Sequence, residues 1–144
     1  MALFGITYSE RAQLKIYSRV IPSCFSLSEY ERLVLLFILQ RTVGWRKAWE
    51  VIAPREFEVG AFRRKAGQKI MIVRGTGLAP GRVIQAVQSL RTMGAIETHE
   101  YPSRTAYRVI EDWCHPDLPQ EGDYAPWRVN EVEYRYSECA NDEK

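Results

Sequence analysis

The sequence predicts an α+β fold, because two helical segments with a strong apolar period precede a pair of short strands. The helices are expected at about Glu29–Thr42 and Arg82–Met93, and the strands at 95–100 and 105–110. A shorter helical turn between the two helices completes a three-helix core. Helix, turn, helix and hairpin in this order outline a winged helix-turn-helix, in which the C-terminal β-hairpin is the wing.

The first of these helices begins at a capping box, in which Ser28 and Glu31 satisfy each other's backbone amides. Apolar residues then recur at helical spacing until Gly44, and they cover nearly the whole circumference of the helix. A helix that is apolar almost all round is buried. We therefore expect it at the centre of the core.

The segment before this helix allows two interpretations. Ser9–Val20 can form an amphipathic helix with Leu14, Tyr17 and Ile21 facing inward. It can also be an extended lead-in that ends at the Ile21-Pro22 break, because a residue before proline disfavours the helical conformation.

The segment after this helix is expected to be short and irregular. Ala48–Ile52 has the composition of a strand, and Ala53-Pro54 starts a helical turn that runs through Phe57 until Gly60 stops it. The basic stretch Phe62–Gln68 is predicted to be a loop.

The second long helix follows a turn marked by Gly75 and Gly77, and Pro80 stands where a helix can begin. Its inward face is set by apolar residues at spacings of three, four and seven, namely Val83, Ala86, Val87 and Leu90. That phase turns a polar face outward, consisting of Arg82, Gln85, Gln88, Ser89 and Thr92. Arginine and glutamine can form paired hydrogen bonds with guanine and adenine, so this face is typical of a helix in the DNA major groove.

The charge distribution also points to a polyanionic partner. Residues 1–110 contain 17 Lys and Arg against 8 Asp and Glu, whereas residues 111–144 contain 3 against 10. Between Lys65 and Ile96 there is no acidic residue at all, although an ordinary solvent-exposed face mixes both signs. Lysine and arginine around the second long helix would neutralise phosphates. The candidate DNA-binding residues are Arg82, Gln85, Gln88 and Ser89 on the helix, and Arg63, Arg64, Lys65, Lys69, Arg74, Arg91 and Arg104 around it.

Length and composition indicate one domain. With 144 residues, 46% hydrophobic and 26% charged, the chain can bury a single core. We expect an N-terminal lead-in at 1–25, the winged-helix domain at 26–110, and an irregular acidic, aromatic tail at 111–144 that packs partly on the body and frays from Ser137 to Lys144. We also expect a cytoplasmic protein without a membrane span, because the longest apolar run, Leu33–Leu39, is too short to cross a bilayer.

Motifs for catalysis and cofactor binding are lacking. Gly75-Thr76-Gly77 is not a dinucleotide fingerprint, and no phosphate-binding loop of the GxxxxGK[ST] type is present. Cys114, His115 and Cys139 lack a fourth metal ligand at a usual spacing. His99 has no identifiable nucleophile to serve as a base. We therefore expect a binding protein that needs no cofactor.

Tyr17–Ile110 resembles the winged-helix N-terminal domain of phage replication proteins of the lambda O type and of related phage and plasmid replication proteins. The resemblance is carried by Ile21-Pro22, Leu27-Ser28-Glu29, Gln40-Arg41-Thr42-Val43-Gly44-Trp45, Phe57 with Gly60, Gly75-Thr76-Gly77-Leu78, and Gly94-Ala95-Ile96-Glu97. It implies that the helix after Gly77 binds repeated sequences at a replication origin, often as a homodimer, with Arg82 and Gln85 among the contacting residues. Ala79 departs from this pattern, since such helices often carry serine there.

The functional expectation is therefore sequence-specific binding of double-stranded DNA by a phage or mobile-element protein, as an origin-binding factor or a transcriptional regulator. The alternative is a protein-interaction module on the same scaffold, which binds and inhibits a host protein. The acidic tail is the expected contact for a replication or host protein.

Overall fold

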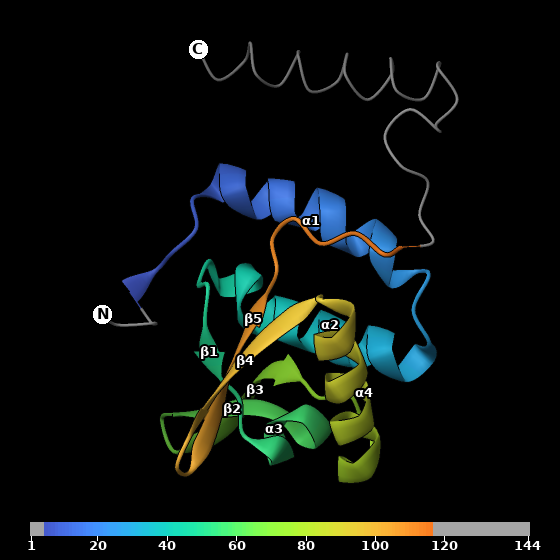
Figure 1. Ribbon diagram of the computed structural model, residues 1–144. Helices are drawn as coiled ribbons and strands as arrows, with labels where there is room; N and C mark the ends of the chain where they lie inside the picture. The colour runs from blue at the N-terminus through green and yellow to red at the C-terminus, as the bar shows by residue number, and fades with distance from the viewer. Residues whose placement is uncertain (1–4, 117–144) are drawn as a thin grey trace, which may run out of the picture.

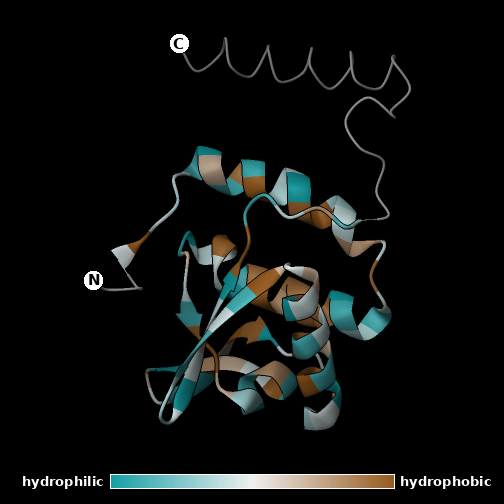
Figure 2. Cartoon of the chain, viewed as in Figure 1, coloured by the Kyte–Doolittle hydropathy of each residue, from teal (hydrophilic) through white to brown (hydrophobic). Residues whose placement is uncertain are grey.

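In the computed structural model, which describes residues 5–116, helix α2 (Glu29–Arg41) lies at the centre of an α+β fold (Figure 1). The predicted capping box is confirmed: the Ser28 hydroxyl accepts from the Glu31 amide, and the Glu31 carboxylate accepts from the Ser28 amide. Val34, Leu35 and Ile38 are fully buried. Figure 2 shows the hydrophobic residues of α2 in brown, enclosed by the other elements.

Helix α1 (Glu10–Cys24) confirms the helical alternative for the N-terminal segment, and the predicted break at Ile21-Pro22 is wrong. Pro22 falls in the last turn, where the lost amide removes one hydrogen bond before the helix ends. The predicted inward face is also rotated, because Ile16 and Val20 are buried whereas Leu14 and Ile21 are exposed. The series through Ile16, Val20 and Cys24 has helical spacing too, and it is the one that packs against the core.

The short elements after α2 follow the prediction. The 3-10 helix η2 (Val43–Trp45) leads to β1 (Glu50–Val51), which pairs antiparallel with β5 (Arg104–Val109), and then to α3 (Pro54–Val59). Phe57 of α3 is buried between Phe37 and Tyr107, with ring centroids 5.2 Å from each.

The predicted loop at Phe62–Gln68 is wrong, because this stretch forms a β-hairpin. Strand β2 (Gly60–Lys65) pairs antiparallel with β3 (Gln68–Arg74). Ala66 and Gly67 form the two-residue turn, both with positive φ, at 53° and 77°. Two such residues in succession define the tight turn whose twist matches that of the strands. The overlooked signals were the β-branched residues of β3 and Gly67 at the turn.

The second long helix and the C-terminal hairpin are confirmed. Helix α4 (Pro80–Met93) has proline in its first turn and ends at Gly94, whose φ is 81°. Strand β4 (Ile96–Tyr101) pairs with β5 from Ile96–Val109 to Tyr101–Arg104, which leaves Pro102 and Ser103 as the turn. The three-stranded sheet has the order β1-β5-β4.

The first residues after β5 contact the N-terminal part of the chain. Trp113 and His115 are buried, and the His115 amide donates to the Ser23 hydroxyl over 2.9 Å. Glu111 accepts from the Tyr8 hydroxyl over 2.6 Å and from Arg108 over 2.7 Å. The expected packing and fraying of the acidic tail beyond residue 116 lie outside the described residues. None of the helices within 5–116 is long and apolar enough to span a membrane.

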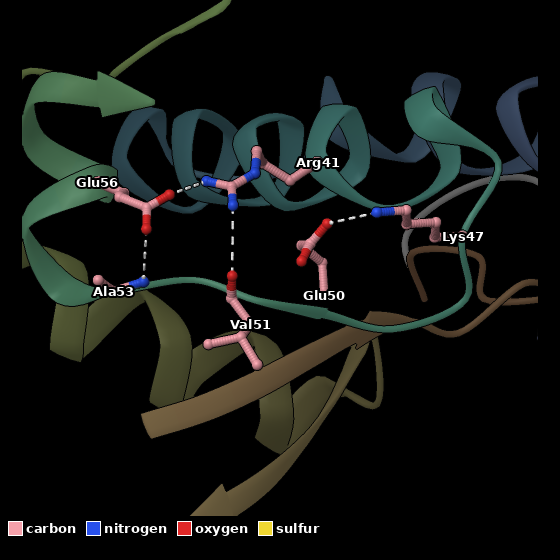
Figure 3. Close-up of polar contacts among 6 residues, drawn as sticks. All are labelled: Arg41, Lys47, Glu50, Val51, Ala53 and Glu56. Carbon is pink, nitrogen blue, oxygen red and sulfur yellow. Dashed lines mark hydrogen bonds and ion pairs between the residues drawn. The ribbon is translucent and has the colours of Figure 1, made fainter. Parts of the chain in front are cut away.

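Arg41, at the end of α2, is a buried cation that connects α2 to β1 and to α3 (Figure 3). Its guanidinium forms an ion pair with Glu56 and donates to the Val51 carbonyl over 3.3 Å. Glu56 also accepts from the Ala53 amide. Lys47 and Glu50 form a second pair nearby, with the lysine half exposed and 3.4 Å between the charged atoms.

We expect Glu56→Ala to lower the free energy of unfolding by about 3 kcal/mol, because it leaves the Arg41 charge buried without its counter-ion. Chemical denaturation measures this change. Glu50→Ala is the matched control, and it should cost less than about 1 kcal/mol because its partner is exposed to water. Equal losses in the two variants would contradict the role given to Arg41.

Candidate nucleic-acid interface

The β2–β3 hairpin and helix α4 are held together at the end of α3 by two glycines. A Cβ at Gly75 would lie 2.4 Å from the Glu58 carbonyl oxygen, and one at Gly60 would lie 2.2 Å from the Val73 carbonyl oxygen. No side chain fits at either position without moving backbone. The chain therefore leaves α3 to form the hairpin and returns to nearly the same point.

Thr76 fixes the start of the segment that leads into α4. Its amide and its hydroxyl both donate to the Phe57 carbonyl, over 2.7 Å and 2.6 Å. The hydroxyl also accepts from the Leu78 amide over 3.2 Å, and the Gly77 amide donates to the Glu58 carbonyl over 3.0 Å. These bonds set the position of α4 relative to α3.

The β2–β3 hairpin and α4 themselves contain no acidic residue. No Asp or Glu occurs between Glu58 and Glu97, and this interval contains β2, β3 and α4 entirely. Its seven cations are all exposed, and they are Arg63, Arg64, Lys65, Lys69, Arg74, Arg82 and Arg91. Five of them lie on the β2–β3 hairpin, and the sequence predicts a loop for its part from Phe62 to Gln68.

The hairpin presents cations on both of its faces. Arg64 is paired with Lys69 across the strands, whereas Arg63 faces Ile70 on the opposite side. Lys69 lies 4.3 Å above the centre of the Phe62 ring. Ile70, Met71 and Ile72 of β3 are exposed between these charges. The tip of the hairpin is hydrophilic in Figure 2.

The outward face of α4 has two parts, one fully exposed and the other in contact with α2. Gln85, Gln88 and Thr92 are exposed as predicted. Ser89 is half-buried, and its hydroxyl donates to Glu31. The Arg82 guanidinium is exposed but lies 5.0 Å from the centre of the Tyr30 ring. Sequence periodicity gave the outward phase of Arg82 and Ser89 but could not show that α2 lies beside them.

The β4–β5 hairpin has mixed charge. Arg104 is exposed beside the turn, with its guanidinium 5.3 Å from the centre of the Tyr101 ring. Glu97 and Glu100 are exposed on β4, and Glu97 lies 3.8 Å from Arg108. His99 packs edge-on against Tyr101. Among the cations predicted around α4, Arg104 therefore differs from the others, because its hairpin also carries acidic residues.

The two hairpins point in a common direction. In Figure 1 the tips of β2–β3 and β4–β5 both extend toward the lower left of the view, and α1 lies at the opposite end of the molecule. Arg91, in the last turn of α4, lines a cleft of about 230 Å³ together with Ile84, Gln88 and Glu100. The candidate cations thus lie on elements other than α1, five on the β2–β3 hairpin, two on α4 and Arg104 on β5.

A cleft of about 930 Å³ lies behind the β2–β3 hairpin, between it and the segment from η2 to α3. Its acidic groups, Glu50 and Glu56, are both in ion pairs, and the Trp45 ring lies between Arg41 at 5.1 Å and Lys47 at 5.6 Å. No three His, Cys, Asp or Glu side chains among residues 5–116 are placed to hold a metal ion. Apart from Arg55, which is exposed, the charged groups that line this cleft form contacts within residues 5–116.

The chain was compared with protein-family models, with curated proteins and with solved structures, and none of the three comparisons found a match.

Glu31 couples the capping box of α2 to Ser89 of α4, and this contact perturbs its pKa. Burial alone would raise the pKa of the carboxyl, but the hydrogen bonds from Ser89 and Ser28 outweigh it and hold the pKa below its ordinary value of 4.5. A lowered pKa in the folded state stabilises the protein above pH 4.5. This stabilisation is lost as the pH falls through the folded-state value.

We expect Ser89→Ala to raise the pKa of Glu31 toward its ordinary value, because the carboxylate loses one donor. A carboxyl carbon NMR titration measures this shift, and acid unfolding should show a shallower loss of stability below pH 4.5. Ser103→Ala, in the exposed β4–β5 turn, serves as the control. If the Glu31 titration were the same in both variants, the coupling between α2 and α4 would be wrong.

Proposed function

We propose that the protein binds double-stranded DNA with sequence preference, with α4 in the major groove and the β2–β3 hairpin against the phosphate backbone. The observation that carries the proposal is that β2, β3 and α4 contain seven exposed cations and no acidic residue. Exposed cations on elements without acidic residues attract a polyanion. Exposed glutamines on α4 supply the groups that read base edges.

The proposed scaffold is a winged helix-turn-helix made of α2, α3, α4 and the β4–β5 hairpin. Helix α4 packs against both α2 and α3, as the second helix of such a motif does. In this arrangement the β2–β3 hairpin is an insertion between α3 and α4. The resemblance to phage and plasmid replication proteins supports a role as an origin-binding factor, or as a transcriptional regulator, that acts as a homodimer.

The charges of the hairpin predict a salt-dependent contribution to binding. We expect the affinity for duplex DNA to fall with salt concentration with a log–log slope of about −3 to −5, which corresponds to roughly 3–6 phosphates per protomer. Replacing Arg63, Arg64 and Lys65 together by glutamine should reduce the slope by about 2 to 3 and weaken binding to all sequences alike. Fluorescence anisotropy over a salt series measures both quantities.

The control for this experiment is the same change of charge in α1, with Arg11, Lys15 and Arg19 replaced by glutamine. These three cations are exposed at the opposite end of the molecule (Figure 1). Equal slopes for the two triple variants would show that net charge, and not the hairpin, determines binding.

Selection from random duplexes tests the assignment of α4. The protein should enrich a preferred site, and replacing Arg82 and Gln85 together by alanine should weaken binding to that site by about tenfold or more, as expected for the loss of one good base contact. Gln40→Ala, an exposed glutamine on α2, should leave the affinity unchanged. If the Arg82 and Gln85 variant kept the affinity for the selected site, these two residues would not contact its bases.

A further inference from the structure

The outward face of α4 contains a small group of side chains that no contact within residues 5–116 accounts for. Arg82 is stacked on Tyr30, and Ser89 is bonded to Glu31. Gln85 and Gln88 make no side-chain hydrogen bond in the part of the chain that the structure describes, and both are exposed. Ile84, one turn before Gln88, is 58% exposed.

Ile84 is an exposed apolar residue on a helix whose inward face is complete without it. Val83, Ala86 and Leu90 are buried on that inward face, so Ile84 is not needed for the core. Its side chain stands at the rim of the cleft between α3, α4 and the β4–β5 hairpin, beside Gln88. An apolar group and a free amide are thus presented together from the same face of α4.

We propose that Ile84 and Gln88 read A·T base pairs, with the Gln88 amide on an adenine and the Ile84 side chain on a thymine methyl group. This inference rests on the proposed binding of duplex DNA. In the major groove the adjacent donor and acceptor of adenine match a carboxamide, and thymine is the base that presents a methyl group there. Two residues four positions apart on a helix are separated by about 6 Å along its axis. Base pairs are about 3.4 Å apart, so the two contacts fall within about two base pairs of each other.

Arg82, the arginine in the first turn of α4, lies over the Tyr30 ring on the flank that faces α2. Reading guanine through Arg82 would require the guanidinium to leave the Tyr30 ring. Gln88 and Ile84 need no such rearrangement, because neither is held by a neighbouring element.

The experiment replaces the thymines of the selected site one at a time by deoxyuridine, which removes only the methyl group. At one position we expect the affinity of the unmodified protein to fall about fourfold, the value for one methyl group returned to water. Ile84→Ala should bind the thymine and deoxyuridine forms of that site equally. Leu14→Ala, an isolated exposed residue of α1, should keep the fourfold response.

Folding of the variants is checked by circular dichroism, and alanine favours the helix at both exposed positions. If every deoxyuridine duplex binds within twofold of its parent, or if Ile84→Ala retains the response, the inference is overturned while the proposed function stands. If no sequence is enriched at all, both fail together.

Discussion

The close approach of backbone at Gly60 and Gly75 is the constraint on which the arrangement of the interface depends. At this point the chain leaves α3, makes a fourteen-residue excursion from 61 to 74, and returns beside the place where it left. Because Thr76 then bonds to Phe57, the start of α4 is fixed on α3 and not on the hairpin. The packing of α4 against α2 and α3 is therefore independent of how far the hairpin projects.

The contacts between α2 and α4 restrict what α4 can offer to a ligand. Glu31 satisfies its own helix start and also accepts from Ser89, so one carboxylate ties two helices together. Arg82 lies over Tyr30 on the same side. These contacts hold one flank of α4 in place in the free protein, so a partner bound there would order fewer side chains. On the opposite flank, Ile84 and Gln88 are exposed.

Much of the fold could be predicted from local signals. The capping box at Ser28, the glycine that ends α4 and the periods of the two long helices each depend on interactions within a few residues, so the sequence displays them directly. The helical period also gave the outward phase of Gln85 and Gln88.

The errors have long-range causes. The predicted inward face of α1 follows the apolar series Leu14, Tyr17 and Ile21. Ile16, Val20 and Cys24 also have helical spacing, and packing in the core buries this second series. The β2–β3 hairpin was missed because its strands are basic and mostly exposed, and so lack the alternation of a half-buried strand. The engagement of Arg82 and Ser89 depends on residues more than fifty positions away in the sequence, which no local pattern reveals.

The two-residue turn of the β2–β3 hairpin has a consequence for how such a protein can diverge. Because Ala66 and Gly67 close the hairpin with no further loop, adding or removing one residue on each strand keeps the turn but exchanges the two faces near the tip. Two residues per strand restore the faces and change the reach by about 7 Å, twice the rise of one strand residue. The length of the β2–β3 hairpin can therefore change in steps of two residues per strand without moving the helices.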